Sequence, residues 1–183
     1  MSVLLIVDVQ KTFKDSKSVV LDILEYQKQF STVYYCYDII SGDGEDPFDM
    51  WDEMVEEFYS ENFQPKIFTK EYAFFRSLMD EGYSDELIVE LGKLMRKYNL
   101  TDAREISESD FYEIFNELFE SHGVNIDFEE LPFYLPHDLL ENLDKLPNNV
   151  TIVGGGVNEC LKEVELVMQI LDKPYAINHQ YCY

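Results

Sequence analysis

Cys160 follows an apolar run and three consecutive glycines, at a point where a helical pattern begins. A thiol at a helix N-terminus gains from the partial positive charge there, which lowers its pKa below the free value of about 8.5. Backbone N–H groups in such a turn can hold an oxyanion, and the glycines Gly154 to Gly156 allow a close approach to a ligand. Cys160 is therefore a candidate nucleophile.

Two other residues that could take part in catalysis end two other apolar runs. Asp8 lies near the end of "VLLIVDV", and Lys70 ends "KIFTK". Ligands of open parallel sheets bind outside the carboxyl ends of the strands, so we expect Asp8, Lys70 and Cys160 at one edge. There Asp8 could act as a base, and Lys70 could stabilise a thiolate or a developing negative charge.

Each of the three residues also has a purely structural interpretation. A single cysteine in an apolar segment is more often a small buried hydrophobe than a nucleophile. An aspartate after a strand is often a cap or turn residue, and a lysine there is usually solvated. The catalytic hypothesis depends on the three occurring together.

The elements that would position these residues alternate along the chain. Strand patterns cover residues 3–9, 32–40, 66–70, 150–155 and 174–183, and helical patterns cover 16–30, 48–62 and 159–172. The near-continuous apolar run at 3–9 is typical of a strand buried on both faces. The alternation predicts an α/β fold, a three-layer Rossmann-like parallel sheet with flanking helices.

One segment interrupts the alternation. Residues 82–131 contain two helical patterns, 84–98 and 107–123, with no clear strand between them. Ser84 is placed to cap the first of these helices. We predict a single domain over 1–183 that carries this α-helical insertion at 82–131.

The composition limits the classes of partner. The 183 residues include 14 Lys and Arg against 37 Asp and Glu, a net charge of −23, which should repel nucleic acids and anionic membranes. No apolar run approaches the roughly 20 residues that a membrane-spanning helix needs. Three cysteines without close spacing favour a reducing, cytoplasmic setting. The charge also supports an alternative function, a catalytically silent acidic protein that binds a basic partner or mimics nucleic acid.

Three stretches together resemble a known family. "LLIVDVQKTF", "KIFTKEYAFF" and "VTIVGGGVNECL" are similar to the isochorismatase-like cysteine hydrolases, the superfamily that includes nicotinamidases. The D-x-Q pattern of that family, followed by an aromatic residue, corresponds to Asp8, Gln10 and Phe13. The helical insertion departs from the usual family pattern, and so do Lys11 and Thr12, where the family often has Asn-Asp.

The resemblance implies a function and a set of site residues. The function is hydrolysis of a C–N, amide-type bond of a small molecule through a thioester, by a triad of Cys160, Asp8 and Lys70. The backbone N–H groups of Gly156 and Cys160 would form an oxyanion hole, next to a cis peptide at Gly155–Gly156. The substrate would contact Phe13, Tyr72 and Gly155.

The metal motif of nicotinamidases is incomplete in this sequence, so we expect a site without a metal or other cofactor. Nicotinamidases bind a divalent metal through a D-x-H motif after the second strand. Asp38 matches the aspartate of that motif, but the histidine position is Ile40. The expected partner is a small-molecule substrate, and the oligomeric state is open, a homo-oligomer included.

Overall fold

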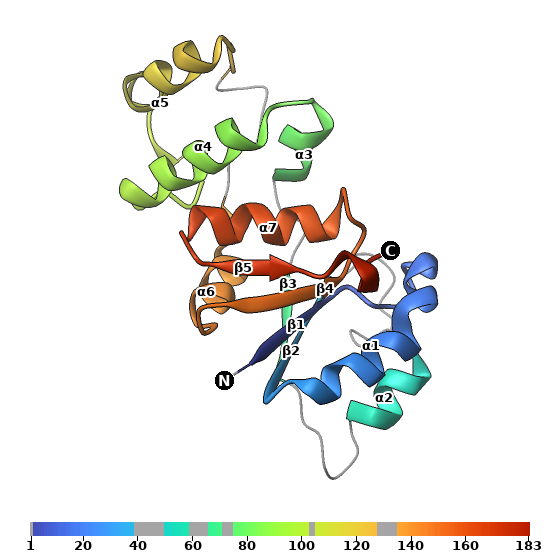
Figure 1. The fold of residues 1–183 in the computed structure, drawn as a ribbon. Coiled ribbons are helices and arrows are strands. Elements are labelled where there is room, and N and C mark those ends of the chain that lie inside the picture. Colours follow the sequence, from blue (N-terminus) through green and yellow to red (C-terminus); the bar gives the residue numbers. More distant parts are fainter. Residues whose placement is uncertain (1, 39–49, 59–65, 71–74, 103–104, 128–134) are drawn as a thin grey trace.

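The structure is a computed structural model that describes residues 2–38, 50–58, 66–70, 75–102, 105–127 and 135–183. Five parallel strands form one sheet in the order β3-β2-β1-β4-β5 (Figure 1). The strands are β1 (Val3–Val7), β2 (Thr32–Asp38), β3 (Lys66–Lys70), β4 (Val150–Gly154) and β5 (Tyr175–Ile177). The predicted α/β fold with a parallel sheet is confirmed.

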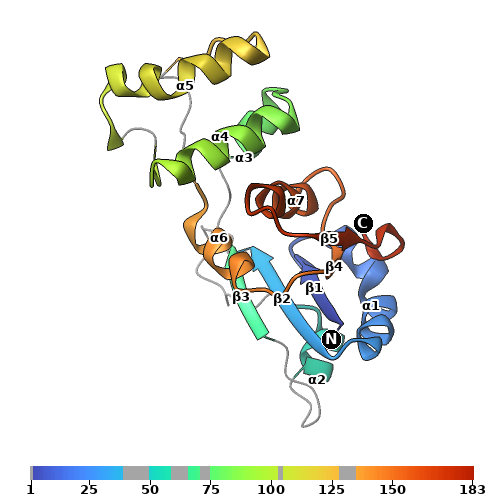
Figure 2. The ribbon, with the colours of Figure 1, turned by 60° about the vertical axis from the view of Figure 1, so that its left-hand side comes forward.

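Helices cover both faces of this sheet, which gives the Rossmann-like three-layer arrangement (Figures 1 and 2). One face carries α1 (Val20–Tyr26), which the 3₁₀ turns η1 (Lys14–Val19) and η2 (Gln27–Gln29) flank, and α2 (Asp52–Phe58). The other face carries α6 (His137–Asp144) and α7 (Cys160–Ile170). No helix in the described residues combines the length and the apolar composition that crossing a bilayer requires.

The central strand β1 is buried on both sides, as its apolar run predicts. Val3, Leu5 and Val7 belong to the apolar cluster on the α7 face. Leu4 and Ile6 belong to the cluster on the α1 face. Because successive side chains of a strand point to opposite faces, the five apolar residues of β1 fill two cores at once.

The predicted insertion forms further helices outside α7. These are α4 (Asp85–Lys97) and α5 (Glu108–His122), and the short helix α3 (Phe75–Asp80) precedes the predicted insertion. Figure 2 shows α4 over α7, and α5 on the far side of α4 from the sheet. The contact between α4 and α7 is close, since a Cβ on Gly92 would lie 2.4 Å from Ile170 Cδ1. The insertion therefore packs on α7, a helix that covers one face of the sheet.

The predicted cap of the first helix of the insertion is confirmed. Ser84 Oγ accepts a hydrogen bond from Leu87 N at 3.2 Å, which satisfies a backbone donor at the start of α4. On α5, Phe111, Phe115 and Phe119 recur every fourth residue and are buried, as their spacing predicts. The periodic pattern alone therefore located both helices.

Three predicted strands are too long, that of β4 only by its last residue, Gly155. β1 ends at Val7, because Asp8 has a φ of 48° and leaves the extended conformation. The predicted terminal strand over 174–183 is wrong beyond Ile177, where the chain turns into a 3₁₀ helix, η4 (His179–Tyr181). Asn178 causes this turn in part, because its side chain accepts a hydrogen bond from Gln180 N at 3.3 Å.

Gln27 offers a test of the core that is independent of any function. Its side chain is buried at 0% exposure, and neither its amide nitrogen nor its amide oxygen has a hydrogen-bond partner in the described structure. Because unpaired buried polar groups cost about 1–3 kcal/mol, Gln27→Met should raise the free energy of unfolding by about 1 kcal/mol. A urea titration with an unchanged slope would measure this gain.

The matched control is Gln29→Met in the same 3₁₀ turn. Gln29 is exposed, so its replacement should change stability by less than about 0.5 kcal/mol. A loss of stability in Gln27→Met would contradict the prediction. It would mean that a buried water pairs with the Gln27 amide.

Candidate functional site

The register of the sheet aligns the carboxyl ends of its strands at one edge. Val7 of β1 lies opposite Cys36 of β2 and Gly154 of β4. Along the next pairing, Asp38 of β2 lies opposite Lys70 of β3. The residue after β1, the last residue of β3 and the turn after β4 therefore share this edge, which we call the strand-end site.

The backbone positions of Asp8, Lys70 and Cys160 thus come to one edge. Asp8 directly follows β1, Lys70 ends β3, and Cys160 begins α7 after the turn that leaves β4. The side chain of Lys70 lies outside the described part of the structure. So does Tyr72, one of the expected substrate contacts.

Asp8 is tightly constrained at the strand-end site. Its exposure is 0%, and both carboxylate oxygens are shielded from solvent. Its φ of 48° is in the left-handed region, which costs a non-glycine residue about 1 kcal/mol. Its main chain is held on both sides, as Asp8 N donates to Cys36 O at 2.8 Å and Asp8 O accepts from Gln10 N at 3.0 Å. A buried carboxylate on a strained backbone is typical of functional sites.

Gln10 of the D-x-Q pattern joins the ends of β1 and β2. Its buried amide donates from Nε2 to Asp38 O at 3.1 Å and accepts through Oε1 from Asp38 N at 2.8 Å. A second link comes from the residue before α2, because Trp51 Nε1 donates to Ser16 Oγ at 2.8 Å and Ser16 Oγ donates to Gln10 O at 2.8 Å. Gln10 therefore fixes the loop that carries Asp8.

The turn from β4 to α7 depends on glycine at two positions. Gly154 has a φ of 75°, and a Cβ there would lie 2.4 Å from the carbonyl oxygen of Val7. Gly155 has a φ of 65°, and its Cβ would lie 3.0 Å from Leu161 N. The turn then enters the helix through Gly156 O, which accepts from Glu159 N at 2.9 Å and from Leu161 N at 3.2 Å.

The cis peptide expected at Gly155–Gly156 is not found, because this peptide is trans. The positive φ angles of Gly154 and Gly155 turn the chain without it. The path from β4 to α7 is thus made by left-handed glycine backbone, which L-residues adopt only at a cost.

Cys160 is the first residue of α7 and is 7% exposed. Its side chain belongs to the apolar cluster on the α7 face of the sheet, together with Val7 and Cys36. Phe13, another expected substrate contact, is half-buried against the same cluster. The apolar packing around Cys160 agrees with its interpretation as a buried hydrophobe. Its position at a helix N-terminus agrees with its interpretation as a nucleophile.

Glu163 is a buried acid at this edge that the sequence interpretation missed. It lies one turn after Cys160 on α7 and is 2% exposed. A signal was present, since Glu163 interrupts the buried stripe of Val164 and Val167 that faces the core. Residues three apart on a helix have Cβ atoms about 5–6 Å apart, so Glu163 and Cys160 are neighbours. With Asp8 and Asp38, the strand-end site contains three buried carboxyl side chains.

The pKa of Tyr35 on β2 responds to the charge of Asp8. Its hydroxyl is buried and donates to Val9 O at 2.7 Å. Burial raises the pKa of Tyr35 well above its ordinary value, and the nearby Asp8 charge raises it further. Tyr35 is therefore a neutral hydrogen-bond donor on the α1 face of the sheet.

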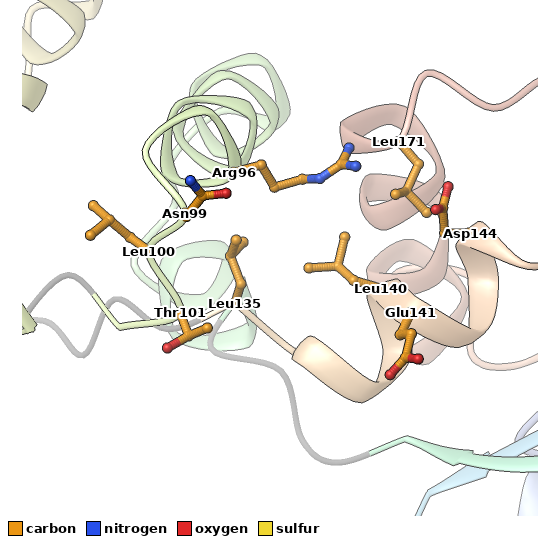
Figure 3. A pocket seen from close by; sticks show the side chains of 9 residues that line it. All are labelled: Arg96, Asn99, Leu100, Thr101, Leu135, Leu140, Glu141, Asp144 and Leu171. Carbon is orange, nitrogen blue, oxygen red and sulfur yellow. The ribbon is translucent and has the colours of Figure 1, made fainter.

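Two cavities lie at opposite ends of α7. The smaller, of about 300 Å³, borders the strand-end site through Val157, Asn158 and Leu161, and it contains an ion pair between Lys162 and Asp85. The larger, of about 380 Å³, lies where α4, α6 and α7 end (Figure 3). There Arg96 extends across the cavity and donates to Ile170 O at 3.1 Å. By size, the larger cavity is the better candidate for a binding site. By its position next to the buried acids of the strand-end site, the smaller cavity is the better candidate.

Comparisons with protein-family models, with curated proteins and with solved structures found no match for the chain. Among the described residues, no group of three or more His, Cys, Asp or Glu is arranged to hold a metal ion. Any functional inference therefore depends on the geometry of the strand-end site and on the sequence motifs that carry the resemblance.

Proposed function

We propose that this chain is a cysteine hydrolase of the isochorismatase-like kind, which hydrolyses a C–N bond of a small molecule at the strand-end site. Cys160 is the nucleophile, Asp8 the base, and Lys70 the cation that stabilises negative charge. The observation that carries the proposal is the strained, fully buried Asp8 at the edge where the glycine turn delivers a cysteine on a helix N-terminus.

The reaction follows from these roles. Asp8 takes the thiol proton, and the thiolate of Cys160, which Lys70 stabilises, then bonds to the amide carbon. The N–H groups of Gly156 and Cys160 hold the resulting oxyanion. The C–N bond breaks as Asp8 returns the proton to the leaving nitrogen, which leaves a thioester. Water then attacks the thioester carbon and gives one proton to Asp8, and the C–S bond breaks as Asp8 passes this proton to the sulfur. The step releases the acid and restores the free thiol and the Asp8 carboxylate.

The spacing of the strands is compatible with the role of Lys70. β1 and β3 are separated by β2 alone, which puts Asp8 and Lys70 on strands about 10 Å apart. The long lysine side chain can reduce this separation at the strand-end site. Phe13 and Gly155 are proposed to contact the substrate, because Phe13 packs on the same face as Cys160 and Gly155 precedes the oxyanion-hole residue.

The proposal can be tested without the natural substrate. p-Nitrophenyl acetate should release a burst of nitrophenolate equivalent to about one acetyl group per chain, because formation of a covalent intermediate outruns its hydrolysis. Mass spectrometry should place the acetyl group on Cys160. Cys160→Ala should abolish the burst, while Cys182→Ala should keep it.

The outcome also separates the hydrolase from the alternative function. No burst, or acetylation spread over lysines and all three thiols, would contradict the hydrolase proposal. The acidic-protein hypothesis, supported by the net charge of −23, would then be preferred. Binding of a basic polypeptide that weakens steeply with salt would support that hypothesis.

A further inference from the structure

The segment Asn178–Tyr183 lies across the ends of β4 and β5 and is anchored at several points. Asn178 N donates to Ile152 O at 3.0 Å, and Asn178 Nδ2 donates to the hydroxyl of Tyr26 on α1 at 3.1 Å. Tyr181 stacks on Tyr26 with ring centroids 4.2 Å apart. In Figures 1 and 2 the C-terminal turn lies beside the end of β4 in both views. This segment therefore holds its last residue at a defined place.

That place is the strand-end site. The N–H of Tyr183 donates to Gly155 O at 3.3 Å, and the main-chain oxygen of Tyr183 accepts from Val157 N at 3.1 Å. The two bonds flank Gly156, whose N–H is the proposed oxyanion donor. The hydroxyl of Tyr183 donates to Asp8 O at 2.7 Å.

We propose that Tyr183 is a positioning residue, which holds the proposed base and the proposed oxyanion turn in register. Its main chain fixes the peptides on both sides of Gly156, and its side chain fixes the carbonyl of Asp8. Because Asp8 has a φ of 48°, a donor on its carbonyl helps to keep a backbone conformation that would otherwise relax. The inference rests on the proposed function of the strand-end site.

Tyr183 acts from the side of the sheet opposite to Cys160. The ring of Tyr183 packs against the cluster on the α1 face, with Val9 and Tyr35. Cys160 belongs to the cluster on the α7 face. Tyr183 therefore supports the strand-end site from behind and does not cover the thiol, which separates a positioning role from an inhibitory one.

The test is Tyr183→Phe, which removes the bond to Asp8 O and keeps the ring and the main-chain bonds. We expect alkylation of Cys160 by iodoacetamide at pH 6 to slow by about threefold to fivefold, the effect of one hydrogen bond, with a steeper dependence on pH. Hydrogen exchange of the amides in residues 8–10 should become faster. Tyr183→Ala should extend the faster exchange to residues 154–157, because the ring also anchors the main chain of Tyr183.

The matched control is Tyr181→Phe in the same segment, which keeps the stacking on Tyr26 and should leave both measurements unchanged. Faster alkylation in Tyr183→Phe would overturn the inference, because it would mean that Tyr183 covers the thiol. Unchanged exchange in both Tyr183 variants would overturn it as well. If Cys160 of the parent protein does not form the acetyl adduct, the proposed function fails, while the exchange measurement still decides whether Tyr183 holds the turn.

Discussion

Gly154→Ala is expected to destabilise the protein by about 2–5 kcal/mol, the sum of a left-handed alanine and a steric overlap. The added Cβ would lie 2.4 Å from the backbone oxygen of Val7. Val7 cannot move away easily, since β1 is paired on both sides, with β2 and β4. The midpoint of urea unfolding would measure the loss.

Gly123→Ala is the matched control for this prediction. Gly123 ends α5 with a φ of 65°, and nothing lies within 4 Å of its added Cβ. Its replacement should cost only the conformational part, about 1 kcal/mol. Equal losses in the two variants would contradict the steric argument, because they would mean that β1 and β4 separate without cost.

Cys160 is expected to keep its reactivity toward iodoacetamide at mildly acid pH. The alkylation rate of an ordinary thiol with a pKa of about 8.5 should fall roughly 150-fold between pH 8.5 and pH 6, as the thiolate is lost. For Cys160 we expect a fall of less than about tenfold, because a helix N-terminus and the lysine charge favour the thiolate. Partial burial of Cys160 slows its alkylation equally at both pH values. The ratio of the two alkylation rates therefore reports only the change in thiolate fraction.

The other two thiols are poor references for this experiment. Cys36 is buried at 0% exposure, and burial raises the pKa of Cys182 to about 11. Both thiols would react slowly with iodoacetamide, and more slowly than Cys160 even if Cys160 were not activated. The ratio of Cys160 rates is therefore the decisive measurement, and an exposed free thiol is the proper standard.

Lysine variants separate the source of this reactivity. Lys70→Ala should restore the steep dependence on pH, because it removes the positive charge that we propose to stabilise the thiolate. Lys66→Ala, at the other end of β3, should leave the ratio unchanged. If the alkylation rate of Cys160 in the unmutated protein depends on pH as that of an ordinary thiol does, only the buried-hydrophobe interpretation of Cys160 is left.

The sequence by itself determined the five strands, most of the helices and the edge at which the candidate residues lie, while no helical pattern was predicted over α3 or α6. Apolar runs are local patterns, and the β1 run specified a strand buried on both faces without knowledge of its neighbours. Ser84 specified the start of α4 in the same local way. The placement of Asp8 and Lys70 at one edge then follows from a general property of parallel sheets, that their carboxyl ends coincide.

Only the tertiary structure decided how this edge is built. The left-handed conformation of Asp8, the burial of Glu163 and the contacts of Tyr183 have no local signal of comparable strength. Asp8 and Tyr183 are 175 positions apart, and their hydrogen bond exists because η4 turns the chain back over the strand ends. A periodic pattern reports which face of an element is buried. It does not report which distant residue meets that face, because strand order and packing, not local conformation, set such contacts.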